Sequence, residues 1–337
     1  MPRLKKGTVV FETFSSRLLK NNPLKDPAER LTPVYLPPGY GAEPQRRYPA
    51  LYLLSGFTGS GPMLLNRQAW EETLPEKLDR LIGAGKAAEM IVVMPDCFTR
   101  YGGSKYVNSS ATGRYEDYVV REIVPWADRL WRTIPKAEAR AVMGKSSGGY
   151  GAFRLGVRHP DVFGHLACHS GDMYFEYCYK TDFPRYCADI ARFGGGAKFL
   201  KAFGKMTPNE RKKNFPAVNI LAMAACYSPN LRAPMGFDLP FDERTGLLKP
   251  GVWKRWEAND PVFMARALAR NLKRLKSIYL DCGTRDEFHL QFGARILSAS
   301  LRRLGVAHVH EEFDDGHMSI AYRYDRSLAF LSKKLST

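Results

Sequence analysis

Gly144, Ser146 and Gly148 form the pattern G-x-S-x-G, the strongest candidate for chemistry in this chain. In this pattern the serine stands on a sharp turn between a strand and a helix. Glycine is needed two positions away on either side, because a larger side chain would collide with neighbouring backbone. The apolar segment 140–143 precedes the pattern, and a helix start rich in Gly and Ala follows it. This context favours a nucleophilic serine; the simpler alternative is a glycine-rich turn whose serine caps a helix.

A nucleophilic serine needs a base, and all seven histidines of the chain follow Ser146 in the sequence. His317 lies between the last predicted strand and the last predicted helix. A loop at this point reaches the carboxyl edge of a parallel sheet, where such a base is expected. His308 and His310 alternate within a strand-like run and are interpreted as ordinary strand residues. We therefore predict that His317 is the base.

The base in turn needs a carboxylate to orient it. Asp286 lies just past a predicted strand, and Gly283 gives the chain room to turn there. Asp281 lies inside that strand and Glu287 starts a predicted helix, so both are weaker candidates. The sequence predicts Asp286 as the acid, with a helix N-cap as its alternative role.

Covalent catalysis at a serine also needs N–H donors for the oxyanion. One is expected from Ser147, the residue after the nucleophile, and the other from the loop after an early strand. The glycine-rich segment 53–61 fits that loop, and the Phe57 N–H is the predicted donor; an ordinary glycine-rich turn is the alternative.

Short apolar runs alternate with longer helical patterns along the chain. This alternation predicts a mostly parallel sheet with helices on both faces, and the first two strands lack a clear helix between them, which indicates an antiparallel start. The predicted strands are Thr8 to Phe14, Leu31 to Leu36, Ala50 to Ser55, Met90 to Met94, Arg140 to Met143, His165 to His169, Ser277 to Cys282 and Ala307 to Phe313. The predicted helices are Trp70 to Ile82, Tyr115 to Leu130, Gly149 to Arg158, Pro261 to Leu275, Phe288 to Leu304 and Met318 to Leu335.

The segment from about 172 to 259 interrupts this alternation, since it is far longer than a usual crossover between strands. It contains clusters of aromatic residues, three consecutive glycines and several prolines. We interpret it as a cap or lid inserted into a single domain that spans residues 1–337.

Composition excludes several classes of protein. The 337 residues are 45% hydrophobic and 25% charged, close to a globular average, so the chain is not disordered or fibrous. The charge of +17 is spread along the sequence without a nucleic-acid motif, so no nucleic-acid partner is expected. The sequence predicts neither a secretion signal nor a membrane span, hence a cytoplasmic protein. No metal site or cofactor is expected, the six cysteines are expected to be reduced, and the oligomeric state is left open.

These motifs resemble those of the esterase family of α/β-hydrolases that includes esterase D (S-formylglutathione hydrolase), enterochelin esterases, feruloyl esterases and mycolyltransferases, with the enterochelin-esterase-like members closest. The resemblance implies the α/β-hydrolase fold, with Ser146 as nucleophile, Asp286 as acid, His317 as base, and the Phe57 and Ser147 amides as the oxyanion hole. The segments that carry it are 34–40, 48–57, 144–152, 283–286 and 316–317.

The expected function is cofactor-free hydrolysis of a small-molecule carboxylic ester through an acyl-enzyme. An acyltransferase with the same triad is the first alternative, and a non-catalytic binding protein of the same fold is the second. Lys105 and Arg114 lie in a polar loop and are interpreted as solvated charges, although they could meet an anionic substrate. Candidate lining residues of the substrate pocket are Trp70, Tyr150, Tyr174, Trp253 and Met318.

Overall fold

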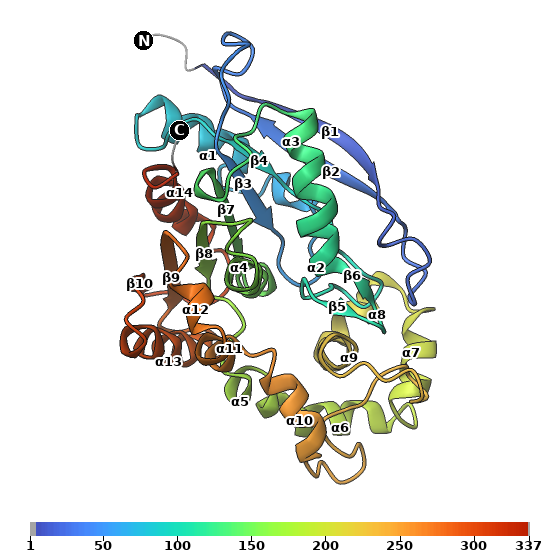
Figure 1. The fold of residues 1–337 in the computed structure, drawn as a ribbon. Helices are drawn as coiled ribbons and strands as arrows, with labels where there is room; N and C mark the ends of the chain where they lie inside the picture. The colour runs from blue at the N-terminus through green and yellow to red at the C-terminus, as the bar shows by residue number, and fades with distance from the viewer. Residues whose placement is uncertain (1–4, 336–337) are drawn as a thin grey trace.

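An eight-stranded sheet in the order β1-β2-β4-β3-β7-β8-β9-β10 forms the centre of the molecule (Figure 1). The structure is a computed structural model that describes residues 5–335. β1 and β2 pair antiparallel, β2 and β4 also pair antiparallel, and the remaining neighbours are parallel. The antiparallel start and all eight predicted strands are confirmed. The strands are β1 (Thr8–Ser15), β2 (Glu29–Leu36), β3 (Ala50–Leu54), β4 (Ile91–Val93), β7 (Arg140–Lys145), β8 (His165–His169), β9 (Ser277–Gly283) and β10 (Val309–Phe313).

Alternate residues of the central strands point to opposite faces of the sheet and belong to two separate hydrophobic cores. Tyr52 and Leu54 of β3 belong to the core beneath α2, α3, α4, α11 and α13, whereas Leu51 and Leu53 belong to the core beneath α1 and α14. Because both faces are covered, the central strands are buried along their whole length, as expected for parallel sheets. The helices are α1 (Leu74–Gly83), α2 (Tyr115–Asp117), α3 (Val124–Leu130), α4 (Ser147–Arg158), α11 (Pro261–Ala267), α12 (Ala269–Leu272), α13 (Leu290–Arg303) and α14 (Tyr324–Ser332).

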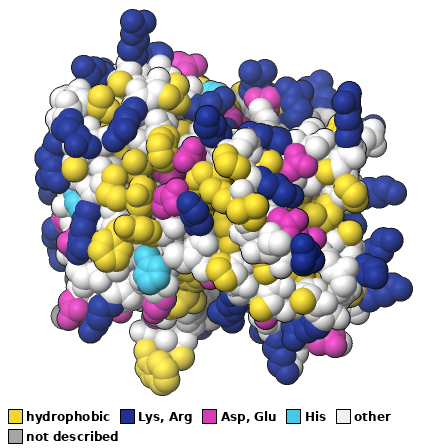
Figure 2. Space-filling view, turned by 90° about the horizontal axis from the view of Figure 1, so that it is seen from below, with side chains coloured by type: hydrophobic (Ala, Val, Ile, Leu, Met, Phe, Trp, Pro, Cys, Tyr) yellow, Lys and Arg dark blue, Asp and Glu magenta, His cyan; other side chains and the backbone are white. Residues whose placement is uncertain are grey.

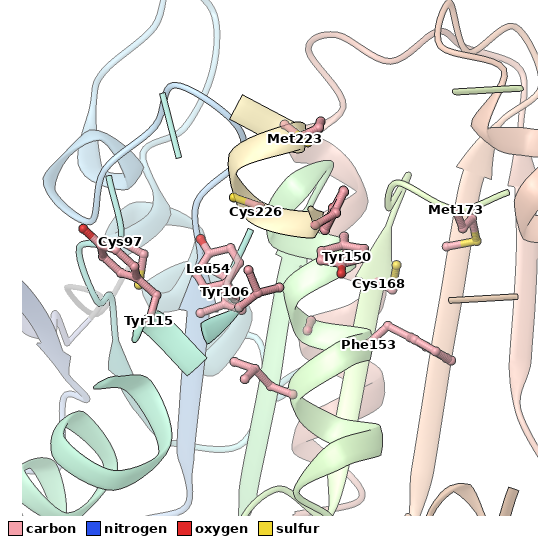
Figure 3. Close-up of a cluster of buried hydrophobic side chains, with 14 of the residues drawn as sticks. Leu54, Cys97, Tyr106, Tyr115, Tyr150, Phe153, Cys168, Met173, Met223 and Cys226 are labelled. Carbon is pink, nitrogen blue, oxygen red and sulfur yellow. The ribbon is translucent and has the colours of Figure 1, made fainter. Parts of the chain in front are cut away.

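The segment between β8 and β9 forms a layer of helices at the carboxyl end of the strands, along the bottom of Figure 1. Its central helix, α9, is buried on nearly all sides, which explains its almost uniformly apolar sequence. Figure 3 shows α9, with Met223 and Cys226, lying over the start of α4 beside Tyr150. The helices are α5 (Phe175–Cys178), α6 (Phe183–Ala191), α7 (Gly196–Phe203), α8 (Pro208–Lys213), α9 (Phe215–Tyr227) and α10 (Pro250–Glu257).

Several local features differ from the sequence-based expectation. The helix predicted over 115–130 contains a π-helical stretch, Tyr118–Ile123, between α2 and α3, and the helix predicted from Met318 begins at Tyr324. The helix predicted from Trp70 begins at Leu74, because Thr73 and Glu76 form a capping box that fixes its start. The pattern predicted as one helix over 261–275 divides at Leu268 into α11 and α12. A two-stranded hairpin, β5 (Asn108–Ser109) and β6 (Gly113–Arg114), was not predicted, because strands of two residues leave no periodic signal.

Basic side chains are dispersed over the surface at the insertion end of the molecule. Figure 2 shows Lys and Arg there among hydrophobic and acidic groups, with many of them around the rim. Within residues 5–335, no helix has the length and apolar content that a membrane crossing requires.

Candidate active site

Ser146 occupies a strained turn between β7 and α4. Its φ of 57° and ψ of −127° lie in a region that residues with a side chain rarely adopt. A Cβ atom on Gly144 would lie 2.5 Å from the carbonyl carbon of Gly148, and one on Gly148 would collide with the carbonyl oxygen of Leu54. The two glycines of the motif are therefore required by close backbone packing, as the sequence argument supposed.

His317 and Asp286 meet in the loops that follow β10 and β9. His317 Nδ1 lies 2.7 Å from Asp286 Oδ2, and both residues are buried. The loops pack closely enough that a Cβ atom on Gly283 would lie 2.6 Å from the Gly316 carbonyl oxygen. Glu287 accepts a hydrogen bond of 2.6 Å from the His317 backbone N–H, so it holds the histidine loop in place.

Ser146 and His317 line one cavity, which we call the outer cavity. It has a volume of about 420 Å³ and is also lined by Phe57, Phe288 and Met318. The structure contains no hydrogen bond between Ser146 and His317; bonds of this type often tighten only when a substrate binds. Because Nδ1 of His317 faces Asp286, Nε2 is the nitrogen left to exchange a proton at the cavity.

Phe57 and Ser147 each offer an N–H group beside Ser146. The Phe57 N–H has no hydrogen-bond acceptor among residues 5–335, and the Ser147 N–H lies in the first turn of α4, where no acceptor exists within the helix. The Phe57 loop is fixed by a 2.6 Å hydrogen bond from the Thr58 N–H to the Gly102 carbonyl. This pair of free donors is what an oxyanion hole requires.

A buried cation that the sequence analysis interpreted as solvated lies next to these donors. Lys105 is only 2% exposed, and its ammonium group forms an ion pair with Asp172 and a hydrogen bond to the Ser147 hydroxyl. Tyr179 donates a 2.7 Å hydrogen bond to the same Asp172 oxygen, Oδ2. The interpretation of Lys105 as solvated was wrong, because its partner Asp172 comes from a loop 67 residues away; Arg114, in contrast, has a side chain that is 54% exposed.

Asp172 is charged within this network. Burial opposes its ionisation, but the Lys105 ammonium and the hydrogen bonds outweigh burial, so the pKa of this carboxyl lies below its usual value. For Lys145, the residue before Ser146, burial is the dominant influence and lowers the pKa of the amine, which favours its neutral form. The ion pair of Lys105 with Asp172 therefore lies directly beside Ser147.

Two smaller cavities adjoin the outer one. The inner cavity, of about 40 Å³, is lined by Ser146 and Ser147 together with Lys105, Asp172 and Tyr179. The side cavity, of about 250 Å³, lies beyond it and is bounded by α5, α9 and the loop before α13. Residues that line both the inner and the side cavities are Cys178, Phe215, Asn219 and Phe288.

Only one of the five candidate pocket residues lines the cavity that holds Ser146 and His317. Met318 does so, and it is 64% exposed. Trp70 projects fully into solvent from its turn, since the helix starts four residues later. Tyr150 is packed in the core, where burial raises its pKa to about 12, and Tyr174 packs edge-on against a neighbouring tyrosine ring. Trp253 is buried in the insertion and donates a hydrogen bond to a glutamate there.

A second constellation of the same residue types lies in the core. His169 Nδ1 is 2.7 Å from Asp281 Oδ1, and His169 Nε2 is 2.8 Å from the Ser327 hydroxyl. None of these three residues is more than 2% exposed, and Arg323 also bonds to Asp281. With no access for a substrate, this group ties α14 to the sheet.

Within residues 5–335, no cluster of three or more potential metal-binding side chains is present. Of the polar groups around Ser146, the sequence analysis did not assign Asp172, Tyr179 or Asn219. Asn219 could have been noticed from the sequence, because it is an amide within an otherwise apolar helix.

Comparison with known proteins identifies the family of this chain. A family model described as "Putative esterase" matches residues 28–319. An endo-1,4-beta-xylanase/feruloyl esterase of Xylanibacter ruminicola is 32% identical over 146 residues, which cover 42% of this chain and 19% of that protein. The chain therefore matches only about a fifth of that relative's length.

Solved structures share the fold over almost the whole chain. A ferulic acid esterase superposes with a TM-score of 0.63 at 21% identity, covering 97% of this chain and 98% of that one. An S-formylglutathione hydrolase from Agrobacterium tumefaciens superposes with a TM-score of 0.60 at 14% identity, covering 98% and 97%. The predicted α/β-hydrolase fold is confirmed by these matches.

Proposed function

We propose, from the premise that this chain belongs to the Putative esterase family, that it is a serine carboxylic-ester hydrolase in which Ser146, His317 and Asp286 form the catalytic triad. One observation carries the proposal. A serine held at φ 57° lines the same cavity as a histidine that is hydrogen-bonded to a buried aspartate. A strained backbone at an accessible serine is typical of a nucleophile held ready for attack.

The proposed reaction has two halves. Ser146 Oγ attacks the ester carbonyl carbon while His317 Nε2 takes the hydroxyl proton, and Asp286 stabilises the imidazolium that results. The oxyanion accepts hydrogen bonds from the Phe57 and Ser147 amides. His317 then gives the proton to the departing alkoxide, which leaves as the alcohol. A water, deprotonated by His317, attacks the acyl-enzyme, and Ser146 is regenerated as the carboxylic acid leaves.

The two sides of Ser146 are proposed to hold different parts of the ester. His317 lines the outer cavity and delivers its proton to the alcohol, so the alcohol part belongs in the outer cavity. The acyl part then faces the inner cavity, on the side of Ser147 and Lys105. Phe215, from the segment 172–259, lines both cavities, which supports a role for that segment as a cap over a single hydrolase domain.

The experiment that tests the proposal compares hydrolysis of p-nitrophenyl acetate by the wild type and Ser146→Ala. We expect Ser146→Ala to lose activity by several orders of magnitude and to lose labelling by a fluorophosphonate. Ser327→Ala is the matched control, since Ser327 is also hydrogen-bonded to a histidine–aspartate pair but is fully buried. Equal turnover by the wild type and Ser146→Ala would refute the assignment.

An acyltransferase is the second candidate, because Phe215 from the insertion lines both cavities beside Ser146, and an aromatic cover over a serine favours a second alcohol over water. In that case a second alcohol replaces water in the deacylation step. Product analysis with methanol as a competing acceptor separates the two. A ratio of methyl ester to free acid far above the ratio of methanol to water in the assay indicates transfer. Free acid as the main product indicates hydrolysis.

A further inference from the structure

The side-chain amide of Asn219 lies at the proposed acyl side of the candidate site and has no hydrogen-bond partner among residues 5–335. Asn219 lies on α9, is 8% exposed, and lines both the inner and the side cavities. Its side chain makes no hydrogen bond to any of residues 5–335, whereas buried polar side chains normally have a partner. The amide is not among the fully occluded unpaired side-chain atoms of residues 5–335, so its polar atoms open onto the cavity and can bind a ligand.

The residues around Asn219 leave its amide as an isolated polar group. The other residues of α9 from Ala217 to Cys226 are apolar, so the amide is not part of a polar face of the helix. Across the inner cavity, Lys105, Asp172 and Tyr179 are already bonded to one another. The amide of Asn219, which has no partner among residues 5–335, therefore remains available to a ligand in this cavity.

The dimensions of the cavities decide which part of an ester reaches Asn219. The inner cavity has about 40 Å³, and by the measure that ~10–15 Å³ holds one water, it has room for roughly three non-hydrogen atoms. An acyl chain longer than this must pass from the inner into the side cavity, and Asn219 lines both. The first few atoms after the ester carbonyl thus lie within reach of the amide.

We propose that Asn219 determines acyl specificity by binding a hydroxyl or carbonyl oxygen that lies within a few bonds of the ester carbonyl. The preferred substrates are then esters of hydroxy- or oxo-substituted acids rather than esters of plain alkyl acids. The proposal rests on the proposed esterase function and deepens it. A site built to hydrogen-bond a substituent rejects the analogue that lacks it, because the amide is then buried without a partner.

The test uses two p-nitrophenyl esters that differ by one hydroxyl, the butyrate and the 3-hydroxybutyrate. For the wild type we expect kcat/KM to be about 10-fold higher for the hydroxy ester, the size of one well-placed hydrogen bond. Asn219→Leu, which keeps the shape but not the amide, should bring this ratio to about one. Asn219→Ala gives the same readout should the leucine variant fold poorly. Asn209→Leu, the same change at an exposed position of the same insertion, should keep the wild-type ratio.

A ratio near one in the wild type, or a ratio unchanged in both Asn219 variants, would overturn the proposal. A second measurement separates this failure from failure of the esterase function. Calorimetric titration of the wild type with 3-hydroxybutyrate and with butyrate does not depend on turnover. Tighter binding of the hydroxy acid that is lost in Asn219→Leu supports the subsite even without hydrolysis, and equal binding of the two acids refutes it.

Discussion

Replacing Lys105 by methionine should destabilise the fold, and the loss should grow with pH. The side chains of Lys105 and Asp172 are only 2% and 10% exposed, so the substitution leaves a buried carboxylate without its cation. Tyr179 and Ser147 still bond to Asp172, at 2.7 and 3.2 Å, but neither carries a charge. Removing one partner of a buried ion pair typically costs about 3–5 kcal/mol of unfolding free energy.

The sign of the pH dependence follows from Asp172. In the wild type its pKa lies below the usual value, so its contribution is present above the unfolded pKa and is lost only as the pH falls through the lower, folded pKa. In Lys105→Met, burial acts without the opposing ammonium, and the pKa of Asp172 should rise above its usual value. The variant then loses stability as the pH rises, so its deficit should be small near pH 5 and largest near pH 8.

Urea unfolding at pH 5 and pH 8 measures this difference. Lys77→Met is the matched control, because Lys77 is also a buried lysine but its partner Asp325 has a side chain that is 35% exposed. An exposed partner is screened by water, so that pair should contribute only about 0–1 kcal/mol. The double variant Lys105→Met/Asp172→Asn should recover most of the stability lost at pH 8. A deficit equal at both pH values, or a double variant no more stable than Lys105→Met, would refute the reasoning.

Three further predictions concern activity and stability. Asp286→Asn should lower kcat about 10,000-fold, because the His317 imidazole loses the partner that fixes its tautomer. Asp281→Asn, which changes the buried partner of His169, should instead lower the urea midpoint and leave p-nitrophenyl acetate turnover near that of the wild type. Gly102→Ala puts a side chain on a backbone with a φ of +103°, which strains the segment whose carbonyl holds the Thr58 N–H; displacement of the adjacent Phe57 N–H, one oxyanion donor, should lower kcat about 100- to 1,000-fold. Burial raises the pKa of Asp260 to about 6, so its contribution favours the folded state at low pH and is lost as the pH rises through 6. Asp260→Asn should therefore reduce the fall in unfolding free energy between pH 5 and pH 7, measured by urea titration, and an unchanged fall would contradict this assignment.

The strands and the residues at their ends could be predicted because their signals are local. Continuous apolar runs mark strands covered on both faces, and the loops after them hold Phe57, Ser146, Asp286 and His317. The parallel topology then brings these loops to one edge, without any need for the sequence to specify a contact. Whether the four residues act in catalysis is what the activity measurements decide.

The environment of the site could not be predicted, because it depends on partners that are distant in the sequence. Lys105 lies among polar loop residues, and nothing near it signals an ion pair with Asp172 or a neighbour such as Ser147. The positions of the aromatic pocket candidates could not be predicted for a related reason. An aromatic residue in the sequence is compatible with a core, a surface or a pocket, and Tyr150 and Trp70 have the first two environments.

The two serine–histidine–aspartate groups of this chain show that hydrogen bonds alone do not identify a catalytic triad. His169, Asp281 and Ser327 have the complete set of hydrogen bonds, yet Ser327 lies in the regular helix α14 with no exposed surface. Ser146 lacks the bond to histidine but has the strained backbone and the cavity. A satisfied, buried hydroxyl is already stabilised by its partners, whereas attack on a carbonyl requires a hydroxyl that is accessible and free to change partners. Backbone strain together with access to a cavity is therefore the better criterion for choosing between the two groups.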